Sequence, residues 1–227
     1  IRLQSTMPIP QTILITGASR GIGRETAYCF AEEGHALILT YNMGKKEGEE
    51  TQKECMKKGA TSVELFSLDL TSDKSIRALS MKIKKVDWLI NNAGVFLPKI
   101  FNDATHEEIK SQLRTNLEGT IKFTHAILPN VKTGIINVAS AAGKEAYPRM
   151  AAYCASKFGL RGFTQGMALD YPRMKWYVVN PGLTATRMTD FQGVHPHQVG
   201  EIIRDTIHGK YKVPNGGDVD VEEILGE

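Results

Sequence analysis

The sequence predicts an α/β fold in which one parallel sheet is covered by helices on both faces. Short apolar runs alternate with longer amphipathic stretches along most of the chain, and each run has the length of a buried strand. The runs are almost continuously apolar, which is typical of parallel strands that are buried on both sides. Right-handed crossovers through helices connect such strands in the doubly wound architecture.

Each expected element follows from its local composition. The apolar runs predict strands at 12–16, 36–41, 63–68, 87–91, 134–139 and 175–180. Helix-forming residues at helical spacing predict helices at 22–33, 45–58, 72–84, 105–128 and 151–171. The tail is less regular, and there we expect a loop at 188–198, a helix at 199–208, and a turn followed by an edge strand within 213–224.

The length of the chain favours one domain. Its 227 residues, of which 41% are hydrophobic and 23% charged, suffice for one sizeable core and are few for two. We expect this domain to span residues 7–227, with a substrate lid and a C-terminal helix and strand in residues 188–227. Met7 is the expected natural start, and residues 1–6 are interpreted as an addition that takes no part in the fold.

Charge and cysteine usage exclude several classes of function. The net charge is only +3 and no basic stripe occurs, so no nucleic-acid partner is expected. Cys29, Cys55 and Cys154 lack metal-binding spacing, and their odd number favours a reduced compartment, so we expect a cytoplasmic protein. The sequence contains neither an apolar run of about 18 residues nor a signal-peptide pattern, so no membrane partner is expected. No metal is expected, because His195 and His197 flank a proline without matching ligand spacing.

A glycine-rich segment, TGASRGIG, joins the first expected strand to the first helix. Gly17 can form the tight turn, Gly21 lets the backbone approach a pyrophosphate, and Gly23 allows the helix to pack closely on the sheet. The N-terminus of the helix adds amide donors and a positive dipole. The segment therefore predicts dinucleotide binding in a Rossmann-type fold, and the alternative is a glycine-rich turn without a ligand.

The residues after the second strand favour NADP over NAD. In dinucleotide-binding folds, an acidic residue about 20 positions beyond the glycines holds the ribose hydroxyls of NAD. This chain has Tyr41 and Asn42 at that point, and no carboxylate lies between Glu33 and Glu47. Arg20, inside the glycine loop, is expected to pair with the 2′-phosphate of NADP.

Further motifs stand at the ends of later strands or on a helix beside them. They are NNAG (91–94), TNLEGT around Asn116, NVASAAG around Ser140, YCASK (153–157) and PGLTAT (181–186). Open α/β sheets bind ligands at the carboxyl ends of their strands. Together with the glycine loop, these motifs closely resemble the short-chain dehydrogenase/reductase family over residues 10–188, and within it the 3-oxoacyl-carrier-protein reductase type.

Tyr153 and Lys157 are four residues apart on an expected helix and therefore share one face. A nearby ammonium stabilises a phenolate, so the pair predicts a Tyr153 pKa lowered from about 10 toward neutral pH. In carbonyl reduction, Tyr153 would then supply a proton, and Ser140 would hold the oxygen on which negative charge develops. Without the other motifs, the same spacing would be an ordinary surface pair.

The family resemblance implies the remaining roles. Tyr153 matches the catalytic tyrosine, and Ser140 matches the serine that orients the substrate. Lys157 matches the lysine that also binds the nicotinamide ribose, and Asn116 matches the asparagine that supports a water-linked proton relay. Contacts to NADP(H) are implied for Gly17, Ser19, Arg20, Ile22, Gly23, Tyr41, Asn42, Asp69, Leu70, Asn92, Ala93, Gly94, Tyr153, Lys157, Pro181, Thr184 and Thr186.

The resemblance weakens after Pro181. The expected lid at 188–199 is short, and the ending GGDVDVEEILGE matches the family pattern poorly. A short lid leaves the site open, so the resemblance implies an NADPH-dependent reductase of 3-oxoacyl thioesters or of small ketones and aldehydes. It also implies a homo-oligomer, either a dimer or a tetramer. Two alternatives stay open: a dinucleotide-binding sensor or scaffold without turnover, and a methyltransferase with a related glycine loop.

Overall fold

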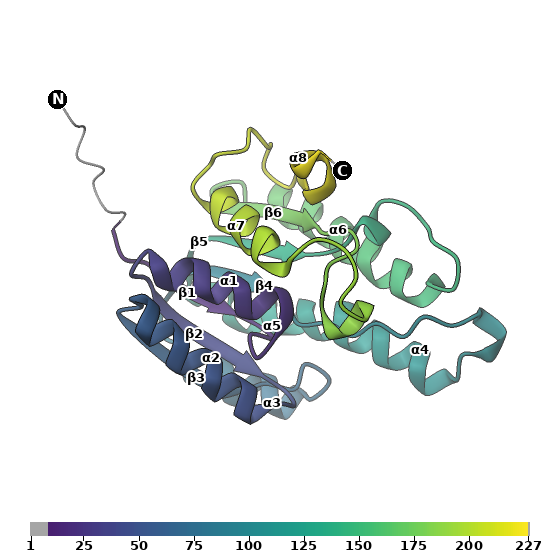
Figure 1. The fold of residues 1–227 in the computed structure, drawn as a ribbon, viewed down its shortest axis with the longest axis horizontal. Helices are drawn as coiled ribbons and strands as arrows, with labels where there is room; N and C mark the ends of the chain where they lie inside the picture. The colour runs from purple at the N-terminus through teal and green to yellow at the C-terminus, as the bar shows by residue number, and fades with distance from the viewer. Residues whose placement is uncertain (1–8, 227) are drawn as a thin grey trace.

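The computed structural model describes residues 9–226, and the expected start at Met7 lies outside this range, as do residues 1–6. The described residues form one seven-stranded parallel sheet in the order β3-β2-β1-β4-β5-β6-β7 (Figure 1). The chain winds outward from β1 to β3 and then returns to place β4 on the other side of β1. The fold is therefore the doubly wound, Rossmann-type α/β fold that the apolar runs predict.

The observed elements correspond to the expected ones with shifted ends. The strands are β1 (Thr12–Ile15), β2 (Ala36–Tyr41), β3 (Ser62–Ser67), β4 (Val86–Asn91), β5 (Val131–Val138), β6 (Lys175–Asn180) and β7 (Asp218–Asp220). The α-helices are α1 (Gly21–Glu32), α2 (Lys45–Lys58), α3 (Asp73–Ser80), α4 (His106–Leu113), α5 (Thr120–Ile127), α6 (Ala151–Asp170), α7 (Pro196–Ile207) and α8 (Val221–Leu225). Short 3₁₀ helices lie at Phe101–Asp103, Leu128–Asn130, Ala141–Gly143 and Arg187–Thr189.

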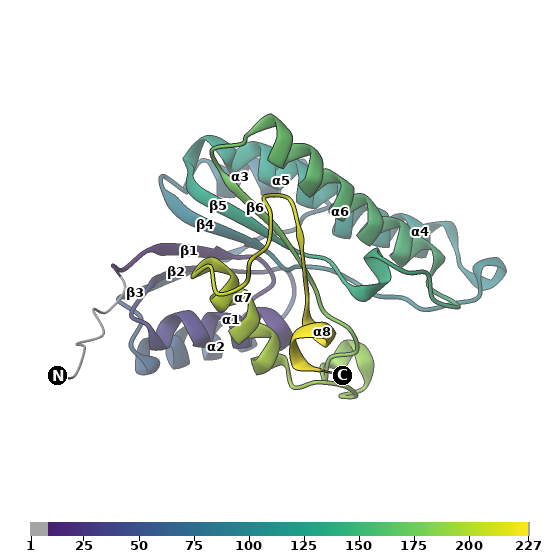
Figure 2. The ribbon, with the colours of Figure 1, turned by 90° about the horizontal axis from the view of Figure 1, so that it is seen from above.

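Helices cover both faces of the sheet, with α1, α2 and α7 on one side and α3, α5 and α6 on the other (Figure 2). Alternate strand residues belong to different cores: Ile13 and Ile15 join the core that contains Phe30 of α1. Leu14, between them, joins the core that contains Phe123 of α5. Burial on both faces explains why the central strands, such as β1 and β4, are almost continuously apolar, whereas the edge strands β3 and β7 are not. No helix within residues 9–226 has the length and apolarity needed to cross a bilayer.

The helix expected at 105–128 is present as a continuous helical segment from His106 to Ile127. Its middle, Arg114–Gly119, is a π-helix that joins α4 to α5, which the sequence pattern did not indicate. At its end, Gly119 lies so close to the Leu70 backbone that an added Cβ atom would collide with the Leu70 carbonyl group. Such π segments insert an extra residue into a helix and frequently occur at functional sites.

The tail differs in part from the expectation. The loop predicted at 188–198 is shorter, because α7 begins at Pro196, where the His195 side chain accepts a hydrogen bond from the His197 amide (3.2 Å). The edge strand is confirmed as β7, which is only three residues long. The residues after it form α8 instead of continuing the strand.

Candidate functional site

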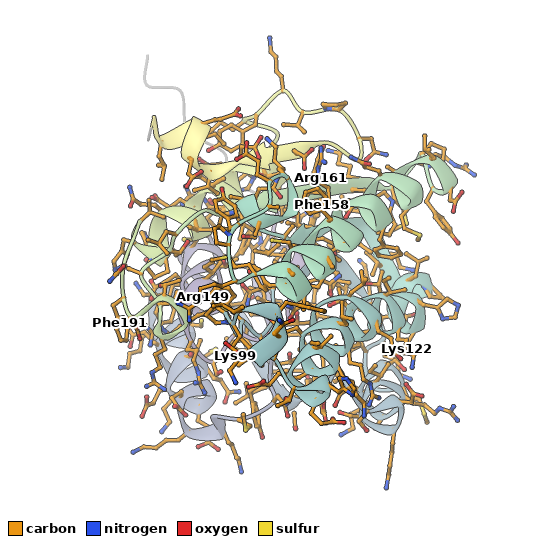
Figure 3. All side chains as sticks on the ribbon, turned by 90° about the vertical axis from the view of Figure 1, so that its right-hand side faces the viewer. Lys99, Lys122, Arg149, Phe158, Arg161 and Phe191 are labelled. Carbon is orange, nitrogen blue, oxygen red and sulfur yellow. The ribbon has the colours of Figure 1, made fainter. Side chains whose placement is uncertain are left out.

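The loops that follow the parallel strands gather at one end of the molecule. Figure 3 looks onto this end and labels Lys99, Arg149 and Phe191, which lie on the loops after β4, β5 and β6. The strand order reverses between β1 and β4, the point at which open α/β sheets bind ligands. The residues that the sequence analysis singled out lie in these loops, at the ends of strands or on the adjoining helices.

Close backbone approaches fix the shape of the glycine loop. Gly17 has a φ of +68°, and an added Cβ atom would lie 2.9 Å from the Ala93 Cα atom. An added Cβ atom on Gly23 would collide with the Gly17 carbonyl oxygen and with the Asn92 amide. The Asn92 Nδ2 atom donates to the carbonyl oxygens of Thr16 (2.9 Å) and Gly17 (3.2 Å). These positions therefore require glycine, and the Asn92 side chain joins the glycine loop to the end of β4.

The glycine loop and its surroundings fit a dinucleotide. The Arg20 side chain makes no capping hydrogen bond at the start of α1, so the first amides of that helix are not occupied by a side-chain cap. Gly21 has a φ of +58°, and an added Cβ atom would lie 3.2 Å from the Thr186 methyl group. At Gly94, an added Cβ atom would lie 3.2 Å from the Asn116 Oδ1 atom. Gly21 and Gly94 thus stand where the start of α1 and the loop after β4 approach Thr186 and Asn116, with no side chain of their own between them.

Ser140 and Tyr153 form the centre of the site. Tyr153 lies in the first turn of α6, and Ser140 follows β5. Burial raises the pKa of Tyr153 to about 12, although a hydrogen bond with the Ser140 side chain lowers it. The Phe96 ring packs edge-on against the Tyr153 ring, with 4.8 Å between the ring centroids. The phenol therefore keeps its proton at neutral pH.

The expectation that Lys157 lowers the pKa of Tyr153 is wrong in this structure. The Lys157 Nζ atom donates to the Val138 carbonyl oxygen (2.9 Å) and lies over the Tyr153 ring, 5.6 Å from its centroid. The lysine is buried, and this burial lowers its own pKa to about 8. The two residues do share a face of α6, as their spacing predicts, but desolvation is the largest influence on the pKa of each.

Asn116 lies in the π-helix and joins three parts of the site. Its Oδ1 atom accepts from the Val95 amide (2.8 Å), and its Nδ2 atom donates to the Val95 carbonyl oxygen (2.8 Å). The Nδ2 atom also lies 3.2 Å from the Ser156 Oγ atom, which donates to the Tyr153 carbonyl oxygen (2.6 Å). Asn116 therefore connects the loop after β4 to the first turns of α6.

The other predicted contact residues lie at the same end of the sheet, but their side chains are not equally available. Ser19 is buried, and its carbonyl oxygen accepts from Thr51 (3.5 Å). The Asp69 carboxylate accepts from the amide and the hydroxyl of Thr71 (2.8 Å each). Leu70 packs into the core on the α5 side. The Asp69 and Leu70 side chains thus have structural partners of their own.

The remaining predicted residues lie at the end of β2, in α1 and in the loop after β6. Tyr41 is half-buried and Asn42 is exposed at the end of β2, while the Ile22 carbonyl oxygen accepts from the Thr26 hydroxyl within α1 (2.8 Å). The Pro181 carbonyl oxygen accepts from the Ala141 amide (2.9 Å) and thereby joins the loop after β6 to that after β5.

Thr184 and Thr186 shape the loop after β6. The Thr184 hydroxyl donates to the Gly182 carbonyl oxygen (3.2 Å), and the Thr186 hydroxyl accepts from the Met188 amide (3.2 Å). The hydroxyl groups of both threonines therefore have local partners.

Two functional candidates were missed by the sequence analysis, and the first is Glu47. Its carboxylate, in the first turn of α2, lies 3.9 Å from the Arg20 guanidinium and 3.4 Å from that of Arg187. No carboxylate lies between Glu33 and Glu47 in the sequence, but Glu47 itself lies beside Arg20, which was not anticipated. Helical turns shorten the distance along the chain, so a residue outside the expected window still reaches the site. The sequence does place Glu47 in the first turn of the helix expected after the second strand, and this position could have identified it as a candidate.

The second missed residue is Glu222 of α8. Its side chain lies against Gly182 of the PGLTAT motif, and an added Cβ atom on that glycine would collide with it. The pKa of Tyr147 is raised, first by burial and further by the carboxylates of Glu145 and Glu222. The C-terminal helix thus brings a carboxylate to the end of β6, where no sequence pattern predicts one.

A separate group of possible metal ligands, Glu33, His35 and His208, lies near the start of β2, at the opposite edge of the sheet. The His35 Nδ1 atom accepts from the Gln11 amide (3.0 Å), so in the neutral ring the Nε2 atom carries the proton. That atom faces the Glu33 carboxylate at 3.3 Å. The group therefore has the arrangement of a charge-assisted contact, not of a metal site.

Comparison with known sequences gives a consistent result. Residues 11–195 match the sequence model described as short chain dehydrogenase. The chain is 34% identical to a 3-ketodihydrosphingosine reductase of Bacteroides thetaiotaomicron, over 82% of this chain and 68% of that protein. It is also 34% identical to an NADP-dependent 3-hydroxy acid dehydrogenase of Schizosaccharomyces pombe, over 79% and 73% of the two chains. Human 17-beta-hydroxysteroid dehydrogenase 13 is 35% identical, but the match covers only 55% of its length.

Solved structures share the same fold. A 3-oxoacyl-[acyl-carrier protein] reductase from Brucella melitensis, in complex with NAD, has a TM-score of 0.85 and 26% identity, covering 94% of this chain and 96% of that one. An alcohol dehydrogenase from Thermococcus sibiricus, complexed with 5-hydroxy-NADP, has a TM-score of 0.84 and 23% identity, covering 93% and 96%. The second likeness shows the fold alone.

Proposed function

Because the chain belongs to the short-chain dehydrogenase family, we propose that it is an NADPH-dependent oxidoreductase that reduces a ketone or an aldehyde to an alcohol. The observation that carries this proposal is the hydrogen bond between Tyr153 and Ser140, at the same end of the sheet as the glycine loop. A phenol that keeps its proton, beside a second hydroxyl, is suited to an oxygen atom that gains negative charge.

Each residue of the site then has a defined task. A nicotinamide cofactor bound beside the glycine loop would supply hydride to the carbonyl carbon of the substrate. Tyr153 donates its proton to the carbonyl oxygen, and Ser140 donates a hydrogen bond to the same oxygen. Lys157, whose pKa is lowered to about 8 by burial, is placed to bind the nicotinamide ribose and to return a proton toward Tyr153. Asn116 positions the loop after β4 and supports this proton path.

NADPH is the proposed cofactor because Arg20 stands in the glycine loop with its guanidinium 43% exposed. A guanidinium can bind a phosphate through two parallel hydrogen bonds. The Schizosaccharomyces pombe relative is named as NADP-dependent. The remaining cofactor contacts proposed from the family resemblance lie in the loops after the strands and on the adjoining helices.

The substrate is proposed to carry an apolar group next to its carbonyl. Exposed apolar side chains occur on the loops after β4 and β6, where they would border the substrate. They are Leu97, Ile100, Phe101, Leu183, Met188 and Phe191. A 3-oxoacyl thioester fits this description, and small apolar ketones and aldehydes are the second candidates. Relatives named as 3-ketodihydrosphingosine reductase and 17-beta-hydroxysteroid dehydrogenase also support an apolar substrate.

We also propose that the enzyme is a cytoplasmic homo-oligomer, either a dimer or a tetramer, as the family resemblance implies. Cys29, Cys55 and Cys154 are free and buried, which suits a reducing compartment. Size-exclusion chromatography with light scattering distinguishes a monomer from either oligomer. A monomeric protein that turns over at full rate would contradict this part of the proposal.

The function is tested by measuring oxidation of NADPH, and in parallel of NADH, with acetoacetyl thioesters, small diketones, aromatic aldehydes and quinones. Turnover that is faster with NADPH is the expected result, and the ranking of substrates separates a 3-oxoacyl reductase from a broad carbonyl reductase. Tight NADPH binding without turnover on any of these compounds would instead favour the alternative, a dinucleotide-binding sensor or scaffold. Binding of S-adenosylmethionine in place of NADPH would favour a methyltransferase.

A further inference from the structure

The segment after β6 forms a strap, residues 184–194, that contacts the start of α1 and the first turn of α2. Its two ends are joined by a bridge between Thr184 and Val194, with a hydrogen bond from the Ala185 amide to the Val194 carbonyl oxygen (2.8 Å). Near its first end, Thr186 lies against Gly21 at the start of α1. The strap is therefore a closed loop, and its first residues lie beside the glycine loop.

Arg187, on this strap, shares a carboxylate with Arg20. The Arg187 Nη1 atom lies 3.4 Å from the Glu47 Oε1 atom, and the Arg20 Nη2 atom lies 3.9 Å from the same oxygen. Gly44, with a φ of +87°, provides the room for this contact, because an added Cβ atom would lie 2.5 Å from the Arg20 Nη2 atom. Three separate segments, which are the glycine loop, α2 and the strap, thus converge on one negative charge.

The three side chains form a site for an anion, and Glu47 is its internal occupant. The pKa of Glu47 is lowered, mainly by a hydrogen bond from its own backbone amide and further by the two guanidiniums. The side chains of Arg20, Glu47 and Arg187 are 43%, 32% and 61% exposed. Exposed ion pairs contribute little, about 0–1 kcal/mol. A phosphate with nearly two charges and several acceptor oxygens therefore competes well with this single carboxylate.

We propose that Arg187 is a second residue that selects NADP, and that the 2′-phosphate replaces Glu47 as the counter-ion shared by Arg20 and Arg187. In the free protein, Glu47 then keeps the two guanidiniums in position and offsets part of their combined positive charge. NAD, which lacks the phosphate, leaves the contact between the strap and α2 intact. This inference rests on the proposed dinucleotide-dependent function, and it gives the strap a role in selecting NADP over NAD.

The test measures dissociation constants by calorimetry for NADPH, NADH, 2′,5′-ADP and 5′-AMP, with no carbonyl substrate. Arg187→Gln is expected to weaken NADPH and 2′,5′-ADP about tenfold and to change NADH and 5′-AMP less than about twofold. The tenfold loss is expected to shrink as salt is added, because the contacts are exposed. Arg173→Gln is the matched control, since Arg173 is exposed and has no ion pair within residues 9–226.

Glu47→Gln provides the opposite change and is expected to tighten NADPH binding about threefold, because the phosphate no longer displaces a carboxylate. Equal weakening of NADPH and NADH in Arg187→Gln would overturn the proposal by placing this side chain on the shared pyrophosphate. Unchanged binding of all four ligands would overturn it by removing Arg187 from the site. If the wild-type protein binds neither NADPH nor NADH, the proposed function itself fails, and that outcome is distinct from both.

Discussion

Lys157 shows how the chemistry of the site conflicts with stability. Its side chain is only about 5% exposed, and its one hydrogen-bond partner in the described chain is the Val138 carbonyl oxygen at 2.9 Å. No carboxylate faces it, so burial alone lowers its pKa to about 8. A buried ammonium without a counter-ion destabilises a folded protein. Its presence is understandable if the amine serves the bound cofactor and Tyr153.

This conflict predicts a pH dependence that Lys157→Met removes. The folded protein releases the Lys157 proton near pH 8, and the unfolded chain releases it near the ordinary value of 10.5. Between these values the unfolded chain binds more protons, so the stability of the wild type rises with pH, by about 3 kcal/mol in total. The free energy of unfolding of Lys157→Met should lack this rise, as urea titrations from pH 7 to 10 would show.

Lys132→Met is the control, because Lys132 is exposed and its loss should leave the pH dependence as it is in the wild type. Parallel stability curves for the wild type and Lys157→Met would mean that the buried amine has an ordinary pKa.

At the residue scale, spacing predicted position better than it predicted electrostatics. The four-residue separation of Tyr153 and Lys157 correctly predicted that both lie on one face of a helix, where the ammonium lies 5.6 Å from the centroid of the phenol ring. The direction of the Tyr153 pKa was wrong, because the depth of burial depends on Phe96 and other residues far along the chain. Glu47 was overlooked for a similar reason, since its approach to Arg20 depends on how α2 packs beside the glycine loop.

Among the elements, the π-helix is the one most closely tied to the site. It carries Asn116, whose amide group exchanges two hydrogen bonds with the Val95 backbone, each 2.8 Å long. It ends at Gly119, which contacts the Leu70 backbone. The extra residue of a π segment changes the direction of a side chain relative to a regular helix. We infer that this change is what turns the Asn116 amide toward the loop after β4.

Asn116→Ala should therefore affect both stability and cofactor binding. Two backbone groups of Val95 lose their partner, which costs roughly 2–3 kcal/mol in the free energy of unfolding. The KM for NADPH should rise, because residues 92–94 lie beside the glycine loop and the adjoining Val95 backbone loses the Asn116 amide that holds it. Urea unfolding and steady-state kinetics measure the two effects.

Asn130→Ala is the control for this prediction. The Asn130 amide donates to the Ile83 carbonyl oxygen (2.9 Å), next to the start of β5 and away from the site. It should lower stability without changing the KM for NADPH. A rise in KM for both variants would indicate a general loss of structure.

The elements also show where sequence patterns stop being informative. The strands β1, β2, β4, β5 and β6 are mostly apolar, and this composition predicts their burial in the two cores. The edge strand β3 has no buried residue, although Val63, Leu65 and Phe66 pack against the cores. By contrast, β7 is short, and two of its three residues are aspartates. It is stabilised by distant partners: Arg161 binds Asp218 through two hydrogen-bonding nitrogens, and Lys144 binds Asp220 at 2.6 Å. Contacts of this kind leave no local periodicity to detect.

At the scale of the whole molecule, the parallel sheet explains why motifs distant in sequence form one site. Every strand has its carboxyl end at the same edge, so the glycine loop, Ser140 and the PGLTAT segment meet there. The sequence order of the motifs and the fold class together predicted this convergence. The sequence did not predict that the strap reaches α2 through Arg187, or that α8 brings Glu222 to the end of β6. Both depend on how the tail packs.

The most direct test of the proposed reductase is to compare NADPH-linked reduction by the wild type and by Tyr153→Phe, using the best carbonyl substrate found. The phenol is the proposed proton donor, so its removal should lower kcat by about a hundredfold or more while NADPH binding stays within about twofold. A Tyr153→Phe protein that binds NADPH and reduces the substrate at the wild-type rate would show that Tyr153 is not the acid, and the proposed mechanism would be wrong.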